Sequence, residues 1–428
     1  MNVAVIGGGY AGMAAAVALA QERVPVTVFE AGKVPGGRAR RIEHPALTLD
    51  NGLHILIGAY VETLRLMRLV GADPDRLLLR TPFSWNVHKR FSLAALPLPA
   101  PFHLAGGLAR SRGLSVGERF SVARFLLRMR STGYRLPRDT SVAELLRRER
   151  QAAAPVRLLW APLCVSALNT QPAAASAQVF LSVLRDTLDA GRGASDLLLP
   201  RADLTALFPA PAAEWIAAHG GNVLTGRRVS AIDPAPEGYT VRHAAGASTH
   251  THVILAVAPH QVQALLPRLP ELGGVAQAIE RFAYQPIYSI YLQYPPAVRL
   301  ATPMLGFESA LLQWGFDRGA LCGQDGLLGL VISADGMHEE HPHDALAPLV
   351  HQELQQQIGP LPEPLWFQVI AERRATFACV PGLVRPPNRT PLANFHLAGD
   401  YTASDYPATI ESAVRSGVAA ASLVTERA

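Results

Sequence analysis

The stretch NVAVIGGGYAGMAAAVALAQERVPVTVFEAG, residues 2–32, decides the fold. Its apolar run at 3–6 is typical of a buried parallel strand, and the alanine-rich segment after it is typical of a helix packed closely on a sheet. Between them, Gly7, Gly9 and Gly12 have the G-x-G-x-x-G spacing, which gives a tight turn, a close backbone approach to a pyrophosphate and close helix–strand packing. The segment therefore predicts a β-α-β unit that binds a dinucleotide.

The second strand of this unit, predicted over residues 24–29, ends at Glu30. A carboxylate about twenty residues after the glycines can accept hydrogen bonds from ribose hydroxyls. The next turn carries Gly36, Gly37 and Arg38. Two glycines expose backbone N–H groups, and an arginine offers a fixed fork of donors to phosphate. We therefore expect this turn to face the same dinucleotide as the first glycines.

A further stretch, GDYTASDYPATIESAVRSG, lies near the end of the chain at residues 399–417. A buried-looking strand at 395–398 precedes it, and a helical pattern follows Pro407. An ordinary C-terminal helix needs neither a Gly-Asp pair nor a loop of small residues in front of it. The stretch therefore suggests that a ligand sits at the start of this helix, where the helix dipole is positive.

Taken together, these segments resemble the superfamily of flavin monooxygenases, amine oxidases and phytoene desaturases. Its second glycine motif is G-G-R, and a D-x-G-x-H segment lies beside the flavin; Asp50, Gly52 and His54 match that segment. The resemblance implies one FAD, bound without a covalent link, and places Gly52 among its contacts.

The resemblance also gives roles to residues in the second half of the chain. It implies that Asp400, after Gly399, hydrogen-bonds the ribityl–pyrophosphate region. It implies that the backbone N–H groups of Thr409 and Ile410 meet the O2 and N1 edge of the flavin, and that the backbone at Val229 contacts the adenine. A helix N-terminus at N1 suits a reduced flavin, which is anionic there.

A chain of 428 residues is too long for one simple core, so two domains are expected. The resemblance implies an α/β fold: a Rossmann-like FAD-binding domain of the amine oxidase and phytoene desaturase type, with a second, mixed α+β substrate domain. The first domain is expected to be discontinuous, over 1–80, 212–270 and 370–428. The intervening stretches, 81–211 and 271–369, are expected to build the substrate domain.

The composition is that of a folded globular protein, with 49% hydrophobic and 17% charged residues. Three scattered cysteines lack metal-type spacing, so we expect neither a disulfide framework nor a metal site. No charged region precedes the first apolar run, and prolines and glycines interrupt the longest uncharged stretch, 91–109. We therefore expect no signal peptide, no membrane-spanning helix and a cytoplasmic location.

The stretch 76–157 is basic, with sixteen Lys and Arg against four acids. No aromatic platform or recognition motif accompanies it, so we expect no nucleic acid partner. Its helical part within 110–130 places four apolar residues on one side: Val116, Phe120, Ala123 and Leu127. Two interpretations stay open: a helix packed on its own domain with arginines in solvent, or peripheral contact with the inner face of the cytoplasmic membrane. The proline-rich apolar loop before the helix tilts the balance toward the membrane.

Internal segments narrow the resemblance within the superfamily. Residues 159–188 predict a buried helix pair joined by an Asn-Thr turn, and together with 197–221 they resemble the hydroxysqualene dehydroxylase group, formerly described as squalene-associated FAD-dependent desaturases. The motif RRATF at 373–377 and the closing PATIESAVRSG also fit. This resemblance covers essentially the whole chain. It implies an FAD-dependent oxidoreductase of squalene and hopanoid biosynthesis that removes the allylic hydroxyl of a polyisoprenoid, hydroxysqualene, to give squalene.

Two alternatives stay open. A carotenoid or phytoene desaturase would run the flavin the other way, taking hydride from its substrate. A non-catalytic prenyl-lipid carrier could share the scaffold, although the intact glycine motifs and the Gly399–Asp400 pair favour an enzyme. Because the chain holds only one dinucleotide fingerprint, the electron donor is unknown.

The proton donor for such a reaction is the least determined residue. His54 lies in the flavin-lining motif and a histidine can donate a proton near neutral pH, but a structural histidine that hydrogen-bonds the loop is the favoured interpretation. Asp405, in the loop before the last helix, is a second candidate. Cys164 is a lesser one, because a buried cysteine usually behaves as a small hydrophobic residue.

Overall fold

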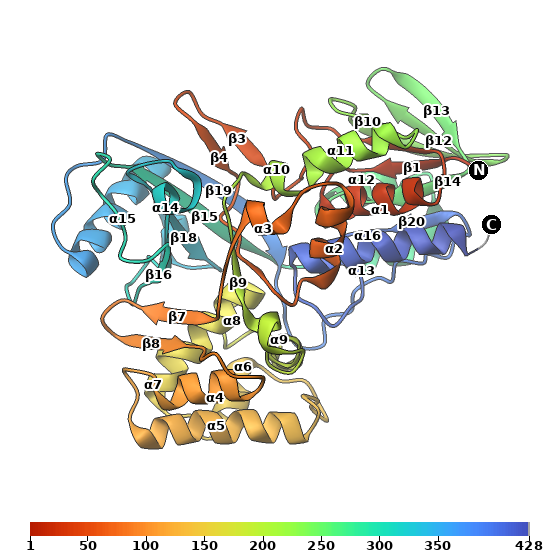
Figure 1. Cartoon of the computed structure of the whole chain (residues 1–428). Coiled ribbons are helices and arrows are strands. Elements are labelled where there is room, and N and C mark those ends of the chain that lie inside the picture. Colours follow the sequence, from red (N-terminus) through yellow and green to blue (C-terminus); the bar gives the residue numbers. More distant parts are fainter. Residues whose placement is uncertain (427–428) are drawn as a thin grey trace.

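The computed structural model describes residues 1–426. Its first layer is a parallel five-stranded sheet (Figure 1). The strands, in spatial order, are β10 (Asn222–Leu224), β2 (Val26–Phe29), β1 (Val3–Ile6), β14 (His252–Leu255) and β20 (Phe395–Leu397). The apolar runs at the two ends of the chain therefore meet in one sheet, and β1 is buried along its whole length.

Two helices pack together on one face of this sheet: α1 (Tyr10–Gln21) and α16 (Ile410–Thr425). A Cβ at position 417 would lie 2.1 Å from the carbonyl oxygen of Ala11, so their close approach depends on Gly417. The alanines of α1 serve the same purpose, since ten of its residues are buried. Helix α11 (Pro209–Ala218) packs beside α1, and α10 (Leu204–Leu207) precedes it.

The other face of the sheet packs against an antiparallel ribbon. Alternation along β1 separates the two sides, because Val3 and Val5 join the core under α1 while Ala4 and Ile6 join the opposite core. The ribbon consists of β11 (Val229–Ala235), β12 (Gly238–His243) and β13 (Gly246–His250). Beyond β14 follow α12 (Pro259–Leu265), the short helix η3 (Pro270–Leu272) and α13 (Gly273–Glu280).

A second, mostly antiparallel sheet of seven strands lies beside this unit (Figure 1). In spatial order it contains β19 (Trp366–Phe377), β15 (Tyr284–Gln293), β18 (Leu327–Ser333), β17 (Trp314–Asp317), β16 (Met304–Gly306), β7 (Ser84–Val87) and β8 (Phe91–Ala94). Helix α15 (His343–Ile358) packs against it, and α14 (Arg318–Cys322) and η4 (Met337–Glu340) lie in its connections.

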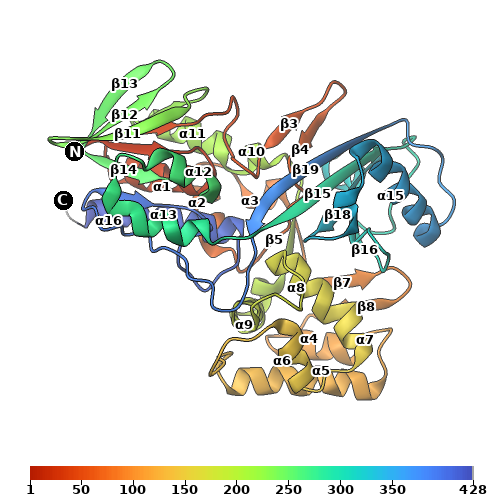
Figure 2. The same ribbon diagram turned by 180° about the vertical axis from the view of Figure 1, so that it is seen from behind.

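A group of helices forms the third part of the molecule, seen from behind in Figure 2. It contains α4 (Phe102–Ala109), α5 (Val116–Ser131), α6 (Val142–Arg148), α7 (Ala153–Pro155), the π-helical turn η1 (Val156–Trp160), α8 (Ala161–Leu168) and α9 (Ala177–Leu188). The predicted helix pair corresponds to α8 and α9, and α8 ends where Asn169 takes a left-handed conformation with φ of 46°. Asparagine tolerates that conformation better than most residues.

Short elements connect these parts. They are the hairpin β3 (Arg41–Glu43) and β4 (Thr48–Asp50), the helices α2 (Val61–Leu69) and α3 (Pro74–Leu77), the 3-10 turn η2 (Arg192–Ser195), and a small sheet of β5 (Leu56–Ile57), β9 (Leu197–Pro200) and β6 (Leu78–Thr81).

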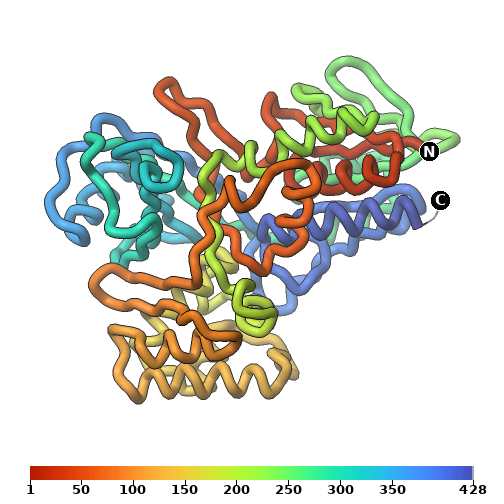
Figure 3. The backbone as a smooth tube through the Cα atoms, in the orientation of Figure 1, coloured from red at the N-terminus to blue at the C-terminus, as the bar shows by residue number. Residues whose placement is uncertain are grey.

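The layout is an α/β fold of the expected type, and the tube in Figure 3 shows how distant segments share its first sheet. All five strands of that sheet fall within 1–80, 212–270 and 370–428. The boundary at 370 lies inside β19. The assignment of a cofactor domain and a substrate domain to these ranges stays a prediction. Within residues 1–426, no helix combines the length and apolar character that crossing a membrane requires.

Candidate cofactor and active site

The three glycines of the first turn differ in what surrounds them in front of α1. Gly7 has φ of +110°, and a Cβ there would lie 2.5 Å from the carbonyl oxygen of Ala256. A Cβ at Gly12 would lie 1.9 Å from the carbonyl oxygen of Gly7, so helix and turn touch only through glycine. At Gly9, by contrast, a Cβ would meet no atom closer than 3.8 Å, the Cα of Gly37. Gly9 therefore borders space that a ligand could fill and a side chain would block.

The second glycine turn lies against the first. The Gly36 N–H donates to the Gly8 carbonyl at 2.8 Å, and Gly36 and Gly37 have φ of +125° and +61°. A Cβ at Gly37 would lie 3.2 Å from the Cα of Gly9. The N-terminus of α1 has no side-chain cap and no acidic residue in its first turn. Its N–H groups and its dipole therefore suit an anionic group such as a pyrophosphate.

Glu30 joins the loops at the end of β2. Its carboxylate accepts from the N–H groups of Gly8 at 2.7 Å and Gly32 at 2.6 Å, and its carbonyl accepts from Arg227 N–H at 2.8 Å. Val229 begins β11 two residues later. Each carboxylate oxygen still has a lone pair for a ribose hydroxyl. Glu30 and Val229, the residues expected to contact the adenosine, thus lie close together in the fold. Their contact with the ligand stays a prediction.

Arg38 and Asp400, both expected to contact the cofactor, pair with each other. Arg38 Nη2 lies 2.6 Å from Asp400 Oδ1, and Nη1 donates to the Ala375 carbonyl at 2.7 Å. A guanidinium and a carboxylate this close gain a charge-assisted hydrogen bond that partly buried surroundings strengthen. The second glycine motif, β19 and the C-terminal loop are therefore tied at one point.

Thr409 and Ile410 form the expected start of the last helix. Thr409 is the N-cap of α16, and its hydroxyl accepts from Ser412 N–H at 3.2 Å. Sequence reasoning missed Arg385, which holds the preceding loop by donating to the carbonyls of Asp400 at 3.4 Å, Tyr406 at 2.9 Å and Ser404. Arg385 stands in no recognisable motif, so no sequence signal marked it.

Tyr401 is a second residue that sequence reasoning missed. Its side chain is fully buried, and its ring fills the space beside Gly399, where a Cβ would lie 2.4 Å from a ring carbon. The Tyr401 hydroxyl has no hydrogen-bond partner within residues 1–426, although the charges of Asp400 and Arg38 act on it. A buried hydroxyl without a partner costs roughly 1–3 kcal/mol. The fold therefore bears this cost beside the Arg38–Asp400 pair, and the hydroxyl itself is closed off from solvent.

In the D-x-G-x-H segment, Asp50 has a structural role and His54 is a candidate for a role in the reaction. Asp50 accepts from Leu204 N–H at 2.8 Å and lies 3.2 Å from Arg318, and burial raises its pKa to about 6. His54 Nδ1 lies 3.0 Å from the Gly52 carbonyl, which can only accept, so Nδ1 carries the proton and the neutral ring presents Nε2 as an acceptor. Burial, with a contribution from Arg38, lowers the pKa of His54.

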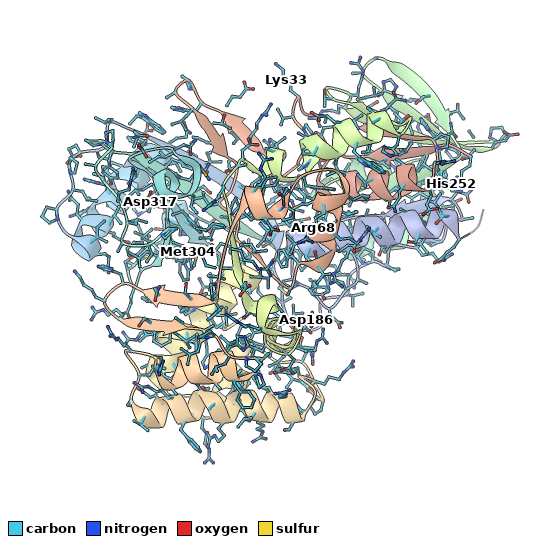
Figure 4. All side chains as sticks on the ribbon, in the orientation of Figure 1. Lys33, Arg68, Asp186, His252, Met304 and Asp317 are labelled. Atoms are coloured by element: carbon cyan, nitrogen blue, oxygen red, sulfur yellow. The ribbon has the colours of Figure 1, made fainter. Side chains whose placement is uncertain are left out.

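These positions bear on the choice of a proton donor. Its lowered pKa keeps His54 neutral at neutral pH. A neutral imidazole is a poor general acid, so this pKa does not favour His54 as the proton donor. Asp405 is 69% exposed and lies 3.9 Å from Arg185 of α9, beside Asp186, which Figure 4 labels. Water reaches its carboxylate freely, so the position gives no support to Asp405. The Cys164 thiol is buried and donates to the Thr170 carbonyl, and burial raises its pKa, as expected of a structural cysteine.

Comparison with known proteins supports the geometric evidence. Residues 10–425 match the family of flavin containing amine oxidoreductases. The chain is 31% identical to the hydroxysqualene dehydroxylase of Rhodopseudomonas palustris, covering 99% of this chain and 98% of that protein. It is 24% identical to the 15-cis-phytoene desaturase of Synechococcus elongatus, covering 100% and 96%. An oxidoreductase of Methanosarcina mazei has the same fold, with a TM-score of 0.77 at 15% identity, covering 98% of this chain and 99% of that one.

The absence of close contacts at Gly9 and the uncapped α1 terminus both fit the cofactor of that family. The cofactor is FAD, and the alternative of a non-catalytic lipid carrier is set aside. From the match over nearly its whole length, the chain belongs to the flavin containing amine oxidoreductase family and is an FAD-dependent oxidoreductase.

Proposed function

We propose that the protein reductively removes the allylic hydroxyl of hydroxysqualene to give squalene. The observation that carries this proposal is the identity of 31% over 99% of the chain to a curated protein of that name. In the reaction the C–O bond breaks, a C–H bond forms with a hydride, and the hydroxyl takes up one proton and leaves as water. Reduced FAD, when bound, supplies the hydride.

We expect the substrate site beside His54 to be apolar. Leu53 and Ile55, its neighbours in the chain, are partly buried against the main core. A polyisoprenoid offers only carbon and one hydroxyl, so an apolar site with a few polar atoms is what it requires. Exclusion of water from such a site also protects a substrate that gains cationic character.

His54 is the residue that we propose to orient the substrate hydroxyl. Among residues 1–426, no group hydrogen-bonds its Nε2, while the Gly52 carbonyl holds Nδ1–H at 3.0 Å. In this tautomer Nε2 accepts the hydroxyl proton in a hydrogen bond and so fixes the direction of the C–O bond. Its lowered pKa keeps the ring in that neutral state at pH 7 and above.

Other residues of the chain prepare the site. The N-terminus of α16, ordered by Thr409, presents backbone N–H groups and a positive dipole where negative charge is expected on the reduced cofactor. Arg385 keeps the loop before that helix in place through three carbonyl groups. Both features would favour hydride donation.

The alternative function is a carotenoid-type desaturase, which the 24% identity to a phytoene desaturase favours. The two proposed functions differ in the direction of hydride transfer. An anaerobic experiment separates them: the bound flavin is reduced with dithionite, hydroxysqualene is added, and products and flavin absorbance are followed. We expect squalene with stoichiometric flavin reoxidation. Double bonds introduced into squalene or phytoene by the oxidised enzyme, with hydroxysqualene left untouched by the reduced enzyme, would favour the desaturase.

The role of His54 has a matched control. His219 also has Nδ1 on a backbone carbonyl, that of Trp215 at 2.8 Å, but it is exposed. We expect His54→Gln to slow flavin reoxidation by hydroxysqualene roughly 10- to 100-fold with FAD binding retained, and His219→Gln to change neither. The wild-type rate should be flat between pH 7 and 8.5. A rate that falls tenfold per pH unit there, and becomes flat in His54→Gln, would instead make His54 the proton donor.

We also propose that the protein works peripherally at the inner face of the cytoplasmic membrane. A polyisoprenoid with a single hydroxyl partitions into the bilayer, so an enzyme that uses it gains by lying on the membrane. The basic stretch 76–157 would support such a location.

A further inference from the structure

Large apolar side chains are exposed on α5 and on the segment that leads through α4 to it. They are Leu98 at 41% exposure, Phe102 at 62%, Val116 at 79%, Phe120 at 69% and Leu127 at 67%. We name these five residues the α4–α5 face. The helix α5 forms the outer edge of the helical group, away from both chain termini (Figures 1 and 2). In Figure 4 a row of side chains extends from α5 away from the rest of the molecule.

The fold does not need this face for packing. Helix α5 buries a different stripe, formed by Val122, Phe125 and Met129, against its own group. The stripe that the sequence pattern singled out, Val116 to Leu127, is therefore the second apolar stripe of the same helix and points outward. A cluster of exposed large apolar residues marks an interaction site.

Arginines border the apolar stripe on both sides. At 100° per residue, Arg119 and Arg130 fall on one flank of the stripe, and Arg124 and Arg128 fall on the other. Arg119 donates to the Ala109 carbonyl and Arg124 to the Glu149 carbonyl, so neither bond cancels a charge. Their long stems can lie along apolar surface while the charged heads reach anionic groups.

Acidic residues near the face are few and engaged. Glu118 closes the capping box of α5 with Ser115. Glu149 and Asp189 lie 3.3 Å from Arg128 and 3.6 Å from Arg130, respectively. Arg110 and Arg112 are exposed, and no carboxylate among residues 1–426 pairs with them. The border of the face is therefore positively charged.

We propose that the α4–α5 face is the membrane-docking surface of the protein, with its apolar residues inserted among the lipids and its arginines on anionic headgroups. An amphipathic helix with an apolar stripe between basic flanks is the arrangement that lies in the plane of an anionic bilayer. An acidic protein groove would match the charges equally, but the face offers no polar pattern beyond arginine. This surface extends the proposed membrane location and is independent of the proposed reaction.

The experiment uses the FAD-loaded full chain and needs no hydroxysqualene. Sedimentation is measured with vesicles of phosphatidylcholine alone and of phosphatidylcholine mixed with phosphatidylglycerol, at low and high salt. We expect binding to the anionic vesicles that weakens with salt. The double variant Phe120→Ser/Leu127→Ser should bind at least tenfold more weakly. Leu365→Ser/Val384→Ser, which removes two exposed apolar residues elsewhere, should bind like the wild type.

A second pair of substitutions tests the charges. Arg110→Gln/Arg112→Gln should reduce the salt dependence and weaken anionic binding severalfold. Absence of binding to either vesicle, equal binding to both, or unchanged binding of Phe120→Ser/Leu127→Ser would overturn the proposal. So would self-association in analytical ultracentrifugation that Phe120→Ser/Leu127→Ser abolishes, since a second copy would then cover the face. Retained flavin absorbance shows that each variant is folded.

Discussion

Gly9 and Gly12 differ in what a side chain would meet. A Cβ at Gly9 has no protein atom within 3.8 Å, and its φ of −74° suits any residue, whereas one at Gly12 would lie 1.9 Å from a carbonyl oxygen. We therefore expect Gly9→Val to fold but to bind FAD at least about a hundredfold more weakly. The valine side chain would keep the pyrophosphate away from the backbone N–H groups, and several hydrogen bonds would be lost at once. Gly12→Ala should fail to fold stably.

Circular dichroism and flavin titration distinguish these outcomes. Gly274→Val, at an exposed position with no atom within 4 Å, is the matched control and should bind FAD normally. If Gly9→Val binds FAD with wild-type affinity, the space in front of α1 does not hold the pyrophosphate.

Asp50 predicts a specific pH dependence of stability. Burial raises its pKa from 3.8 to about 6, so the folded state binds the proton more tightly than the unfolded state does. Its contribution to stability is therefore full below pH 3.8 and is lost as the pH rises through about 6. Asp50→Asn cannot titrate. We expect the free energy of unfolding of the wild type, relative to that of Asp50→Asn, to fall between about pH 4 and pH 6 and to stay level above.

Urea denaturation of both proteins across this pH range, at a fixed excess of FAD, measures the difference. Parallel curves for the two proteins would show that Asp50 keeps its ordinary pKa in the fold, and that its 3.2 Å contact with Arg318 outweighs burial.

At the scale of the element, Glu411 of α16 caps a different helix. Its buried carboxylate accepts from the N–H groups of Glu62 at 3.1 Å and Thr63 at 2.9 Å, at the start of α2, and from the Thr63 hydroxyl at 2.7 Å. Arg415 donates to it at 2.7 Å. Helix α2 has no side-chain cap of its own. Glu411→Ala should therefore lower the free energy of unfolding by on the order of 3 kcal/mol, because several donors lose their acceptor.

Glu62→Ala is the control for this change. Glu62 pairs with Arg65 at the surface, with side-chain exposures of 21% and 46%, and such pairs contribute less than about 1 kcal/mol. Chemical denaturation compares the two variants. Equal losses would mean that Glu411 stabilises α2 no more than a surface ion pair does.

Local patterns allowed the elements around the glycine turns and at the end of the chain to be predicted, and long-range contacts set the limit. The strand at 3–6, the helix after the glycines and a last helix after Pro407 follow from the spacing of nearby residues. For α5 the pattern revealed the apolar stripe through Phe120 but could not say which of two stripes faces the core, because neighbours distant in sequence decide that. The stripe with Val122 faces the core because it packs against the other helices of the group.

The site shows the same limit. Its glycines were predictable because each imposes a local backbone geometry. The pairing of Arg38 with Asp400, the carbonyl contacts of Arg385 and the capping by Glu411 join residues through side chains whose partners no local pattern specifies. Sequence reasoning therefore named Arg38 and Asp400 as contacts of one cofactor without predicting that they touch.

On the scale of the whole molecule, the expected cofactor site draws on segments that are far apart in the sequence. The Arg38–Asp400 bond alone spans 362 residues of chain, and Glu30, Gly36 and Thr409 are expected to contact the same cofactor from further segments. FAD that binds only the folded state stabilises it by about 2.7 kcal/mol at a free concentration of 100 times its Kd. For a chain of 428 residues this corresponds to a rise in Tm of about 3 °C.

Thermal unfolding of the apoprotein titrated with FAD should show that rise, growing with the logarithm of the FAD concentration. Gly9→Val, folded but unable to admit the pyrophosphate, should show none. A rise of equal size in Gly9→Val would mean that FAD stabilises the chain from another place.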